Sequence, residues 1–285
     1  MVAITLDGEL AATELKESLK QRIAKLAELS VIPGLGTILV GDDGPSKNYI
    51  SMKHRDCKEL GMHSQEITLP GDTSQHEIIE AVEAFNHDPQ IHAFIIQYPF
   101  PDELDYESAL LEVLPHKDAD GLHPINLGRL VQGINAPLAC TPAGIQLLLE
   151  RFDVPISGQH VVIIGRGLTI GRPLANLLAL KRSNANAAVT VIHTGVKNLA
   201  DYTRQADIIV AAAGSPGMIT ADMVKPGAAV VAAGVSFDGK KLLSDVSDEV
   251  EEVAGWLSPR IGGVGPMTRA LLMQNTVSAA ELAAS

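Results

Sequence analysis

The chain has 285 residues, 46% hydrophobic and 20% charged, a composition typical of globular proteins long enough to form two domains. Its formal net charge of −12, with no concentrated stripe of Lys and Arg, argues against nucleic acid as a partner. No apolar run approaches the roughly 20 residues of a membrane span, and the N-terminus has no signal-peptide pattern, so we expect a cytoplasmic protein without a membrane partner.

Helical and strand-like patterns alternate through the first half of the chain. Helices are predicted at residues 10–27, 47–60, 75–85 and 106–114, and strands at 34–41, 64–69 and 92–97. Residues 115–137 are rich in Gly, Pro, Asp and Asn and are predicted to form a loop. Because helices cross between successive strands, we expect an α/β/α domain with a mostly parallel sheet over residues 1–140.

A second βα pattern follows, and it predicts a Rossmann-type doubly wound parallel sheet over residues 141–266. Its strands are predicted at 160–165, 189–193, 207–212 and 228–233, and its helices at 141–152, 172–181 and 198–204. A glycine loop at 262–268, with Pro266 at the expected first helical position, leads into a last helix over 267–285. The fold class is therefore α/β, with two domains and a cleft between them.

The sequence HVVIIGRGLTIGRP at residues 160–173 is a short apolar strand, a glycine-rich turn and a helix start. Gly165, Gly167 and Gly171 permit close backbone approach, and the next helix presents its N-terminus to a pyrophosphate. The spacing is GxGxxxG rather than GxGxxG. We therefore predict a dinucleotide site; the alternative is a tight turn that binds nothing.

The end of the following strand indicates which nicotinamide cofactor binds. Residues Thr194-Gly195 stand where an NAD site usually has Asp or Glu against the ribose diol. Arg166 in the glycine turn and Thr194 can instead bind a 2′-phosphate, which favours NADP over NAD. The alternative for Arg166 is a solvated surface charge.

Four polar residues in the first half are candidates for chemistry. Tyr49 and Lys53 are four apart on one helix face, although the pair taken alone favours a solvated lysine beside a half-buried tyrosine. Gln97 ends an apolar strand before Tyr98-Pro99 and either reads a ligand or caps the backbone. Asp120 lies in the long loop, where it either accepts hydrogen bonds from a ring edge or makes a turn.

Other chemistries have little support in the sequence. The nine histidines form no HExxH or HxxxH pattern, His54 with Cys57 being the nearest approach, so we expect no metal. Neither a GxSxG elbow nor a phosphate loop is present. Cys57 and Cys140 have no zinc or disulfide spacing and are expected to be buried. Asp42-Asp43-Gly44-Pro45 is interpreted as a turn entering the next helix.

Together these pieces resemble the bifunctional methylenetetrahydrofolate dehydrogenase/cyclohydrolase family, over nearly the whole chain. The matching segments are GDDGPSKNYISMK (41–53), QYPFP (97–101), KDADGLHPINLGRL (117–130), CTP (140–142), the glycine turn, and GGVGPMTRALLMQNT (262–276). The chain differs from many family members at four places: they have Ser where this chain has Gly167, Asp-Val where it has Ala232-Ala233, Pro where it has Ile261 and Arg where it has Gly195. These differences affect the predicted cofactor preference more than the predicted reaction.

The resemblance implies a role for each candidate residue. It implies that Lys53 is catalytic, that Tyr49 positions the folate ring system, that Gln97 supports the lysine and that Asp120 holds the pterin. Substrate would also contact Pro99, Gly263 and Pro266, with the loop at 262–266 closing near the nicotinamide. Cofactor positions would be Gly165, Arg166, Gly167, Thr194 and Val235. It further implies a cytoplasmic homodimer whose last helix packs on the first domain.

The implied reaction belongs to one-carbon folate metabolism and purine biosynthesis. In it, NADP oxidises 5,10-methylenetetrahydrofolate to the methenyl cation, and water then opens this cation to 10-formyltetrahydrofolate. The alternatives are a monofunctional methylenetetrahydrofolate dehydrogenase, a shikimate or amino-acid type dehydrogenase of the same architecture, and a non-catalytic folate or dinucleotide sensor.

Overall fold

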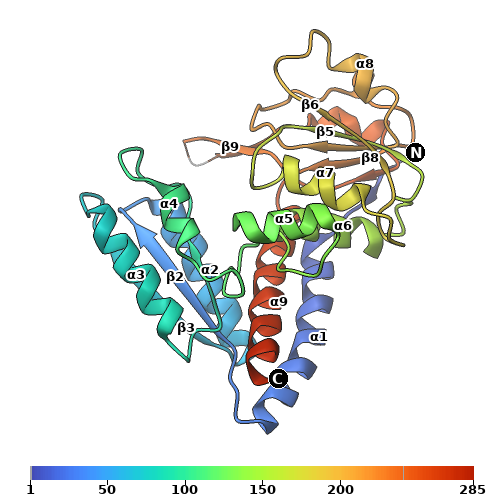
Figure 1. Ribbon diagram of the computed structural model, residues 1–285. Coiled ribbons are helices and arrows are strands. Elements are labelled where there is room, and N and C mark those ends of the chain that lie inside the picture. The colour runs from blue at the N-terminus through green and yellow to red at the C-terminus, as the bar shows by residue number, and fades with distance from the viewer. Residues whose placement is uncertain (1, 240) are drawn as a thin grey trace. The chain divides into compact units, whose positions relative to one another are not determined.

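The computed structural model describes residues 2–239 and 241–285, which divide into two compact units (Figure 1). The first unit contains residues 2–13 and 139–268, and the second contains residues 14–138 and 269–285. Two helices contribute residues to both units. The helices α1 (Gly8–Glu28) and α9 (Val264–Ala284) each begin in the first unit and end in the second.

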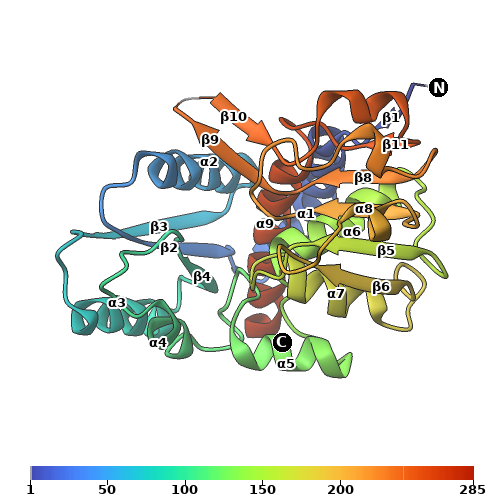
Figure 2. The same ribbon diagram turned by 90° about the horizontal axis from the view of Figure 1, so that it is seen from above.

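The second unit is built on a parallel sheet in the order β3-β2-β4. These strands are His63–Leu69, Gly34–Val40 and Ala93–Ile96, and the helices packed on them are α2 (Gly44–Leu60), α3 (Gln75–His87) and α4 (Tyr106–Leu111). Figure 2 shows α2 on one face of the sheet and α3 with α4 on the other. The core under α3 is apolar, with Ile38, Val82 and Phe94 buried. This arrangement confirms the predicted α/β/α layers.

One predicted loop contains a helix. Residues 115–137 were expected to be irregular, but α5 spans Pro124–Gln132. His123 caps it by accepting a hydrogen bond from the Ile125 N–H, Pro124 occupies its first turn and Gly133 ends it in the left-handed conformation. The prediction was wrong because Gly and Pro were interpreted as loop residues, whereas here they mark the two ends of a short helix.

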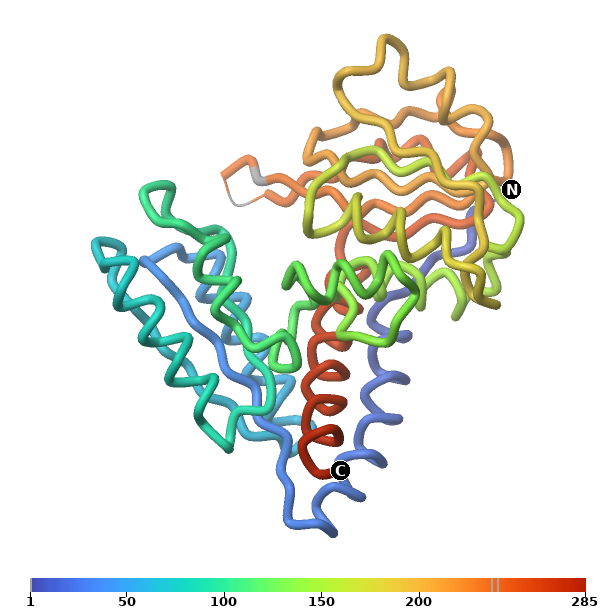
Figure 3. Tube along the Cα trace, viewed as in Figure 1, coloured from blue at the N-terminus to red at the C-terminus, as the bar shows by residue number. Residues whose placement is uncertain are grey.

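The first and last helices run side by side in the second unit, as the blue and red tubes of Figure 3 show. Arg22 and Glu281 join them through an ion pair of 2.6 Å. The last helix begins at Val264, two residues before the predicted start at Pro266. A proline is tolerated there because the first four N–H groups of a helix have no partner within it.

The first unit contains a parallel sheet of six strands in the order β1-β11-β8-β7-β5-β6. The strands are Ile4–Thr5, Trp256–Leu257, Ala229–Ala232, Ile208–Ala211, His160–Ile164 and Ala188–Ile192. Its helices are α6 (Cys140–Arg151), α7 (Gly171–Ala179) and α8 (Ala200–Thr203), with short 3₁₀ turns at Ala221–Met223 and Asp248–Glu252. This confirms the predicted doubly wound sheet.

Three short features of this unit were not predicted. The strands β1 and β11 have two residues each, too few to show a pattern. The hairpin of β9 (Val235–Asp238) and β10 (Lys241–Ser244) was also missed.

The strand order of this sheet reverses between β5 and β7. Ligands of open α/β sheets bind at such a reversal, so we expect them at the carboxyl ends of these two strands.

Candidate active site

Lys53 lies on α2, which begins at the turn predicted for residues 42–45. Asp43 is the N-cap of this helix and accepts a hydrogen bond from the Ser46 N–H at 2.9 Å. The Lys53 side chain is only 8% exposed, and its Nζ donates to Oε1 of Gln97 at 2.8 Å. The same Nζ lies 5.6 Å from the centroid of the Tyr49 ring. Lys53 is therefore a buried amine held by two predicted site residues, not a solvated lysine.

Gln97 is fixed by the end of β4. Its backbone N–H donates to the Ile38 carbonyl at 2.8 Å, and its side-chain NH₂ donates to the Tyr98 carbonyl. This second bond orients the amide so that Oε1 faces Lys53. The amide thus caps the chain, which was the second interpretation of Gln97, and it also contacts the lysine; a ligand contact stays a prediction. The following Tyr98–Pro99 peptide is cis, and Pro99 is exposed.

Tyr49 exposes 40% of its surface beside Lys53. Burial around its hydroxyl raises its pKa, the cation of Arg269 lowers it and the carboxylate of Asp120 raises it. A partly exposed ring with a cation and an anion in its surroundings suits a planar ligand that has both hydrogen-bond donors and acceptors. The carboxylate of Asp120 therefore belongs to the surroundings of Tyr49, and its contact with the pterin stays a prediction.

Two aspartates of the loop between α4 and α5 have different environments. Asp118 is buried and accepts hydrogen bonds from the N–H groups of Gly121 and His123, at 2.9 and 2.8 Å, and from the Asn126 amide at 2.9 Å. Asp120 is half-buried. Asp118 therefore forms a turn with the residues that follow it, and both interpretations of Asp120 stay open.

Sequence reasoning missed Tyr106 at this site. It lies on α4, with its ring edge-on to the rings of Tyr98 and Phe100 at 5.8 and 5.5 Å. Burial raises the pKa of its hydroxyl, and the neighbouring Asp120 adds to the shift. Tyr106 is 14 residues before Asp120, and no sequence pattern links two residues at this separation.

An ion-pair group formed by Lys16, Asp56 and Arg269 was also missed. Asp56 is 4% exposed, and its two oxygens are held by Lys16 Nζ at 2.6 Å and Arg269 Nε at 2.8 Å. Lys16 also contacts Glu59 at 3.0 Å. The three residues come from α1, α2 and α9, so no local pattern reveals them.

The predicted cofactor residues lie at the carboxyl edge of the six-stranded sheet. Gly165 has a φ of +121°, and a Cβ there would lie 2.2 Å from the Ala212 carbonyl oxygen. A Cβ at Gly171 would lie 2.1 Å from the Gly165 carbonyl oxygen, whereas one at Gly167 would meet nothing within 4 Å. Only two of the three glycines are therefore required by packing.

The helix after this turn can receive an anion. Its N-cap residue, Ile170, makes no side-chain capping bond. In its first turn the Arg172 N–H donates to the Gly167 carbonyl at 3.1 Å and Pro173 has no N–H, so this end of α7 offers a phosphate mainly the positive end of the helix dipole. Arg166 is exposed in the same turn, consistent with either phosphate binding or the solvated alternative.

A pocket of 660 Å³ adjoins the end of β6. Thr194, Lys197, Asn198, Arg204 and Ser215 are among its lining residues. Arg204 is paired with Asp222 at 3.0 Å. Lys197 adds a cation that sequence reasoning did not consider.

The remaining predicted positions also lie in the first unit. Val235 is 46% exposed at the start of β9. Nearby, the buried Asp245 accepts hydrogen bonds from the N–H groups of Ala213 and Gly214, at 2.7 and 2.9 Å, and so fixes the loop after β7. Gly263 is at the turn before α9, where a Cβ would lie 2.4 Å from the Pro259 carbonyl oxygen, and Pro266 is buried.

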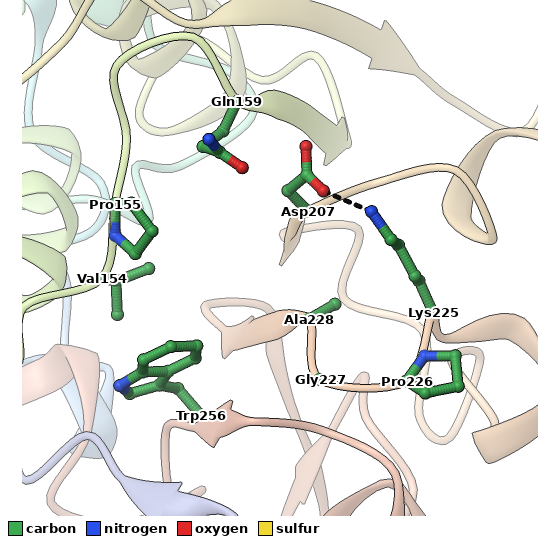
Figure 4. A pocket seen from close by; sticks show the side chains of 9 residues that line it. All are labelled: Val154, Pro155, Gln159, Asp207, Lys225, Pro226, Gly227, Ala228 and Trp256. Atoms are coloured by element: carbon green, nitrogen blue, oxygen red, sulfur yellow. Dashed lines mark hydrogen bonds and ion pairs between the residues drawn. The ribbon is translucent and has the colours of Figure 1, made fainter.

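A smaller pocket of 200 Å³ lies at the opposite, amino-terminal edge of this sheet (Figure 4). Its polar side chains include Asp207 and Lys225, which are paired at 2.6 Å, and its apolar wall includes Trp256. Ligands of open α/β sheets bind at carboxyl ends, so we do not assign the cofactor here.

Within residues 2–239 and 241–285, no three His, Cys, Asp or Glu side chains are grouped as metal ligands would be. No helix in the same described ranges has the length and apolar character needed to span a membrane. Cys57 and Cys140 are both buried, as expected from the sequence.

The glycine turn on a doubly wound sheet and the buried lysine on a second α/β unit define a dinucleotide-binding α/β enzyme. The chain belongs to the tetrahydrofolate dehydrogenase/cyclohydrolase family: the catalytic-domain model of this family matches residues 6–120, and its NAD(P)-binding-domain model matches residues 139–284.

Individual relatives agree with this assignment. The chain is 52% identical over 281 residues to the bifunctional protein FolD of Syntrophotalea carbinolica, covering 99% of this chain and 97% of the relative. It matches the crystal structure of the Campylobacter jejuni bifunctional methylenetetrahydrofolate dehydrogenase/cyclohydrolase with a TM-score of 0.94, at 37% identity over 99% of both chains. The Trypanosoma brucei enzyme, solved with NADP and an inhibitor, gives 0.93 at 33% identity over 99% of both chains.

Proposed function

We propose that this chain is a bifunctional enzyme that oxidises 5,10-methylenetetrahydrofolate with NADP and hydrolyses the methenyl product to 10-formyltetrahydrofolate. Family membership over both domains supports the two activities. The observation that carries the proposal is the buried Lys53, held by Gln97 beside the exposed face of Tyr49.

NADP fits the residues at the carboxyl edge of the first unit. The backbone at Gly165 and Gly171 has no room for a side chain, and the positive end of the α7 dipole would attract the pyrophosphate. Thr194 and Arg166 would hold the 2′-phosphate, since no acid follows β6 to bind a ribose diol. When bound, the nicotinamide accepts a hydride from the methylene carbon.

The two steps make unequal demands on the protein. A nitrogen lone pair beside the methylene carbon drives hydride loss, so the residues have only to orient the substrate. In the hydrolysis, water adds to the methenyl carbon and loses a proton, and the bond from this carbon to N5 then breaks as N5 takes a proton. We assign both proton transfers to Lys53 Nζ, with Gln97 holding the amine and Asp120 accepting from the pterin N–H groups.

The assay follows both activities in one cuvette. Methylenetetrahydrofolate is mixed with NADP or NAD, and nicotinamide reduction is recorded, followed by decay of the methenyl chromophore. We expect reduction to be faster with NADP, followed by hydrolysis above the uncatalysed rate. Reduction without catalysed hydrolysis would indicate the monofunctional alternative, and binding without turnover the sensor.

Substitution of Lys53 separates the two reactions. We expect Lys53→Met to lower the hydrolysis rate at least about 100-fold while hydride transfer falls less, because only hydrolysis needs general acid–base catalysis. Lys47→Met is the matched control, since Lys47 lies on the same helix with an exposed side chain. Equal loss of both activities, with folate still bound, would remove Lys53 from the proton transfers.

We also propose that the protein is a cytoplasmic homodimer, and that its product supplies one-carbon units for purine biosynthesis. These properties are supported by the family resemblance. Light scattering coupled to gel filtration measures the oligomeric state, and a mass near 30.1 kDa would indicate a monomer instead.

A further inference from the structure

The ion-pair group of Lys16, Asp56 and Arg269 takes no direct part in hydride transfer or in hydrolysis. Its charges are largely shielded from solvent, with side-chain exposures of 13%, 6% and 13%. Two cations on one carboxylate leave the group with a formal charge of +1. Arg269 supplies part of this charge permanently, because a guanidinium does not lose its proton in proteins.

Helical register places this group next to the reactive amine. Asp56 follows Lys53 by three residues on α2, so the two side chains lie on neighbouring positions of one helix face. Arg269 is also close to Tyr49, because its cation lowers the pKa of that hydroxyl. The Tyr49 ring in turn lies 5.6 Å from Lys53 Nζ.

A lone buried carboxylate at position 56 would stabilise the ammonium form of Lys53, which cannot accept a proton. Lys16 and Arg269 more than neutralise that carboxylate. A net positive charge in a poorly solvated region disfavours a second cation nearby.

We propose that Asp56 and Arg269 are positioning residues that, with Lys16, maintain a net charge of +1 beside Lys53 and thereby favour its neutral, proton-accepting form. This inference rests on the proposed function, because it concerns the base of the hydrolysis step.

Other charged groups near Lys53 are kept constant in the test. On α2 these are Tyr49 and His54; His54 contacts Glu66 of β3 at 3.5 Å, and its pKa is lowered by burial and by Lys53. Asp120 belongs to the loop between α4 and α5. Glu59 contacts Lys16 at 3.0 Å and would bring the formal charge of the four groups to 0, but its side chain is 52% exposed and screened by water, so the charge shielded from solvent is that of the other three.

The test changes the charge of the group in steps. Arg269→Met gives 0, the wild type +1 and Asp56→Asn +2, while the double variant Asp56→Asn/Arg269→Met returns to +1. The pH dependence of kcat/KM is measured for hydrolysis and for hydride transfer in each protein. Each unit of charge should move the acid limb of hydrolysis by about 0.5 to 1 pH unit.

The expected order follows the charge and not the number of substitutions. The acid limb should lie at higher pH for Arg269→Met, at lower pH for Asp56→Asn, and near the wild-type position for the double variant. The pH profile of hydride transfer should not shift, because that step moves no proton. Arg269→Lys retains the cation and should retain the wild-type limb.

A purely structural role predicts a different result, with the double variant most impaired and both activities affected together. That outcome, or acid limbs that do not follow the charge, would overturn the inference. If Arg269→Met fails to fold, the comparison of Asp56→Asn with Arg269→Lys and wild type still tests the direction. A wild-type enzyme without catalysed hydrolysis would overturn the proposed function instead.

Discussion

At the scale of single residues, Asp118 and Asp120 show how two identical side chains take different tasks. We expect Asp120→Asn to weaken folate binding about 10-fold or more, because a carboxylate that only accepts becomes an amide that also donates. Asp118→Asn should mainly lower stability, since Asp118 accepts three hydrogen bonds within the protein. Calorimetric folate titration and thermal unfolding of both variants measure the contrast; unchanged folate affinity in Asp120→Asn would remove it from the site.

The glycine turn gives a second residue-level contrast. Gly165→Ala should cost about 1–3 kcal/mol from its backbone conformation, and more from the approach to Ala212. Gly167→Ala should leave stability nearly unchanged, because a Cβ at this position meets nothing within 4 Å. Denaturant unfolding of the two variants measures the difference. Similar losses would show that residue 167 is constrained in a way that the packing does not reveal.

At the scale of elements, prediction succeeded where the signal was local. The glycine turn and the strand before it are contiguous, and so are Tyr49 and Lys53 on one helix. Asp56 and Arg269 are 213 residues apart, and their pairing depends on α2 and α9 packing together. Composition also failed for α5, where a short helix is set by its caps and not by a long apolar pattern. Functional residues that are close along the chain can therefore be predicted from the sequence. Ion-pair partners that only the packing of distant helices brings together cannot.

A contact between β2 and His92, the residue before β4, predicts that the stability of the fold depends on pH. His92 Nδ1 accepts a hydrogen bond from the Gly34 N–H at 3.1 Å, and burial, with Lys117 and His63 nearby, lowers the pKa of this ring. The unfolded chain therefore binds a proton first as pH falls below about 6.5, and stability is lost between that value and the lower folded pKa.

The substitution His92→Asn tests this effect. It keeps a side-chain acceptor without a titrating ring, so the fall in unfolding free energy between about pH 7 and 5 should become shallower. His76→Gln is the control, because His76 is 80% exposed. An unchanged slope in His92→Asn would assign the pH dependence to other groups.

At the scale of the whole molecule, the chain order does not follow the compact units. Residues 2–13 supply β1 to the six-stranded sheet of the first unit, although the next 125 residues belong to the second. The strand β1 has two residues and pairs with β11, 252 residues further along the chain. So short a strand has no sequence pattern, so the sequence does not predict that the first residues join this sheet. The functions predicted for residues 1–140 and 141–266 stay predictions.

Because α1 and α9 each contribute residues to both units, we expect the units to unfold together, unlike many two-domain proteins. Trp256 is the only tryptophan and reports on the first unit. Cys57 reports on the second, since burial raises the pKa of its thiol to about 12 and suppresses labelling while the fold is intact. In a Cys140→Ala background, which leaves Cys57 as the only thiol, both probes should give the same denaturant midpoint.

NADP makes this test stricter, because its predicted ligands all belong to the first unit. At about 100 times its Kd, a ligand that binds only the folded protein stabilises it by about 2.7 kcal/mol. If the helices couple the units, NADP raises the labelling midpoint of Cys57 as much as the fluorescence midpoint of Trp256. A shift seen by Trp256 alone would show that the second unit unfolds independently. The helices α1 and α9 would then unfold in two parts, divided after residues 13 and 268.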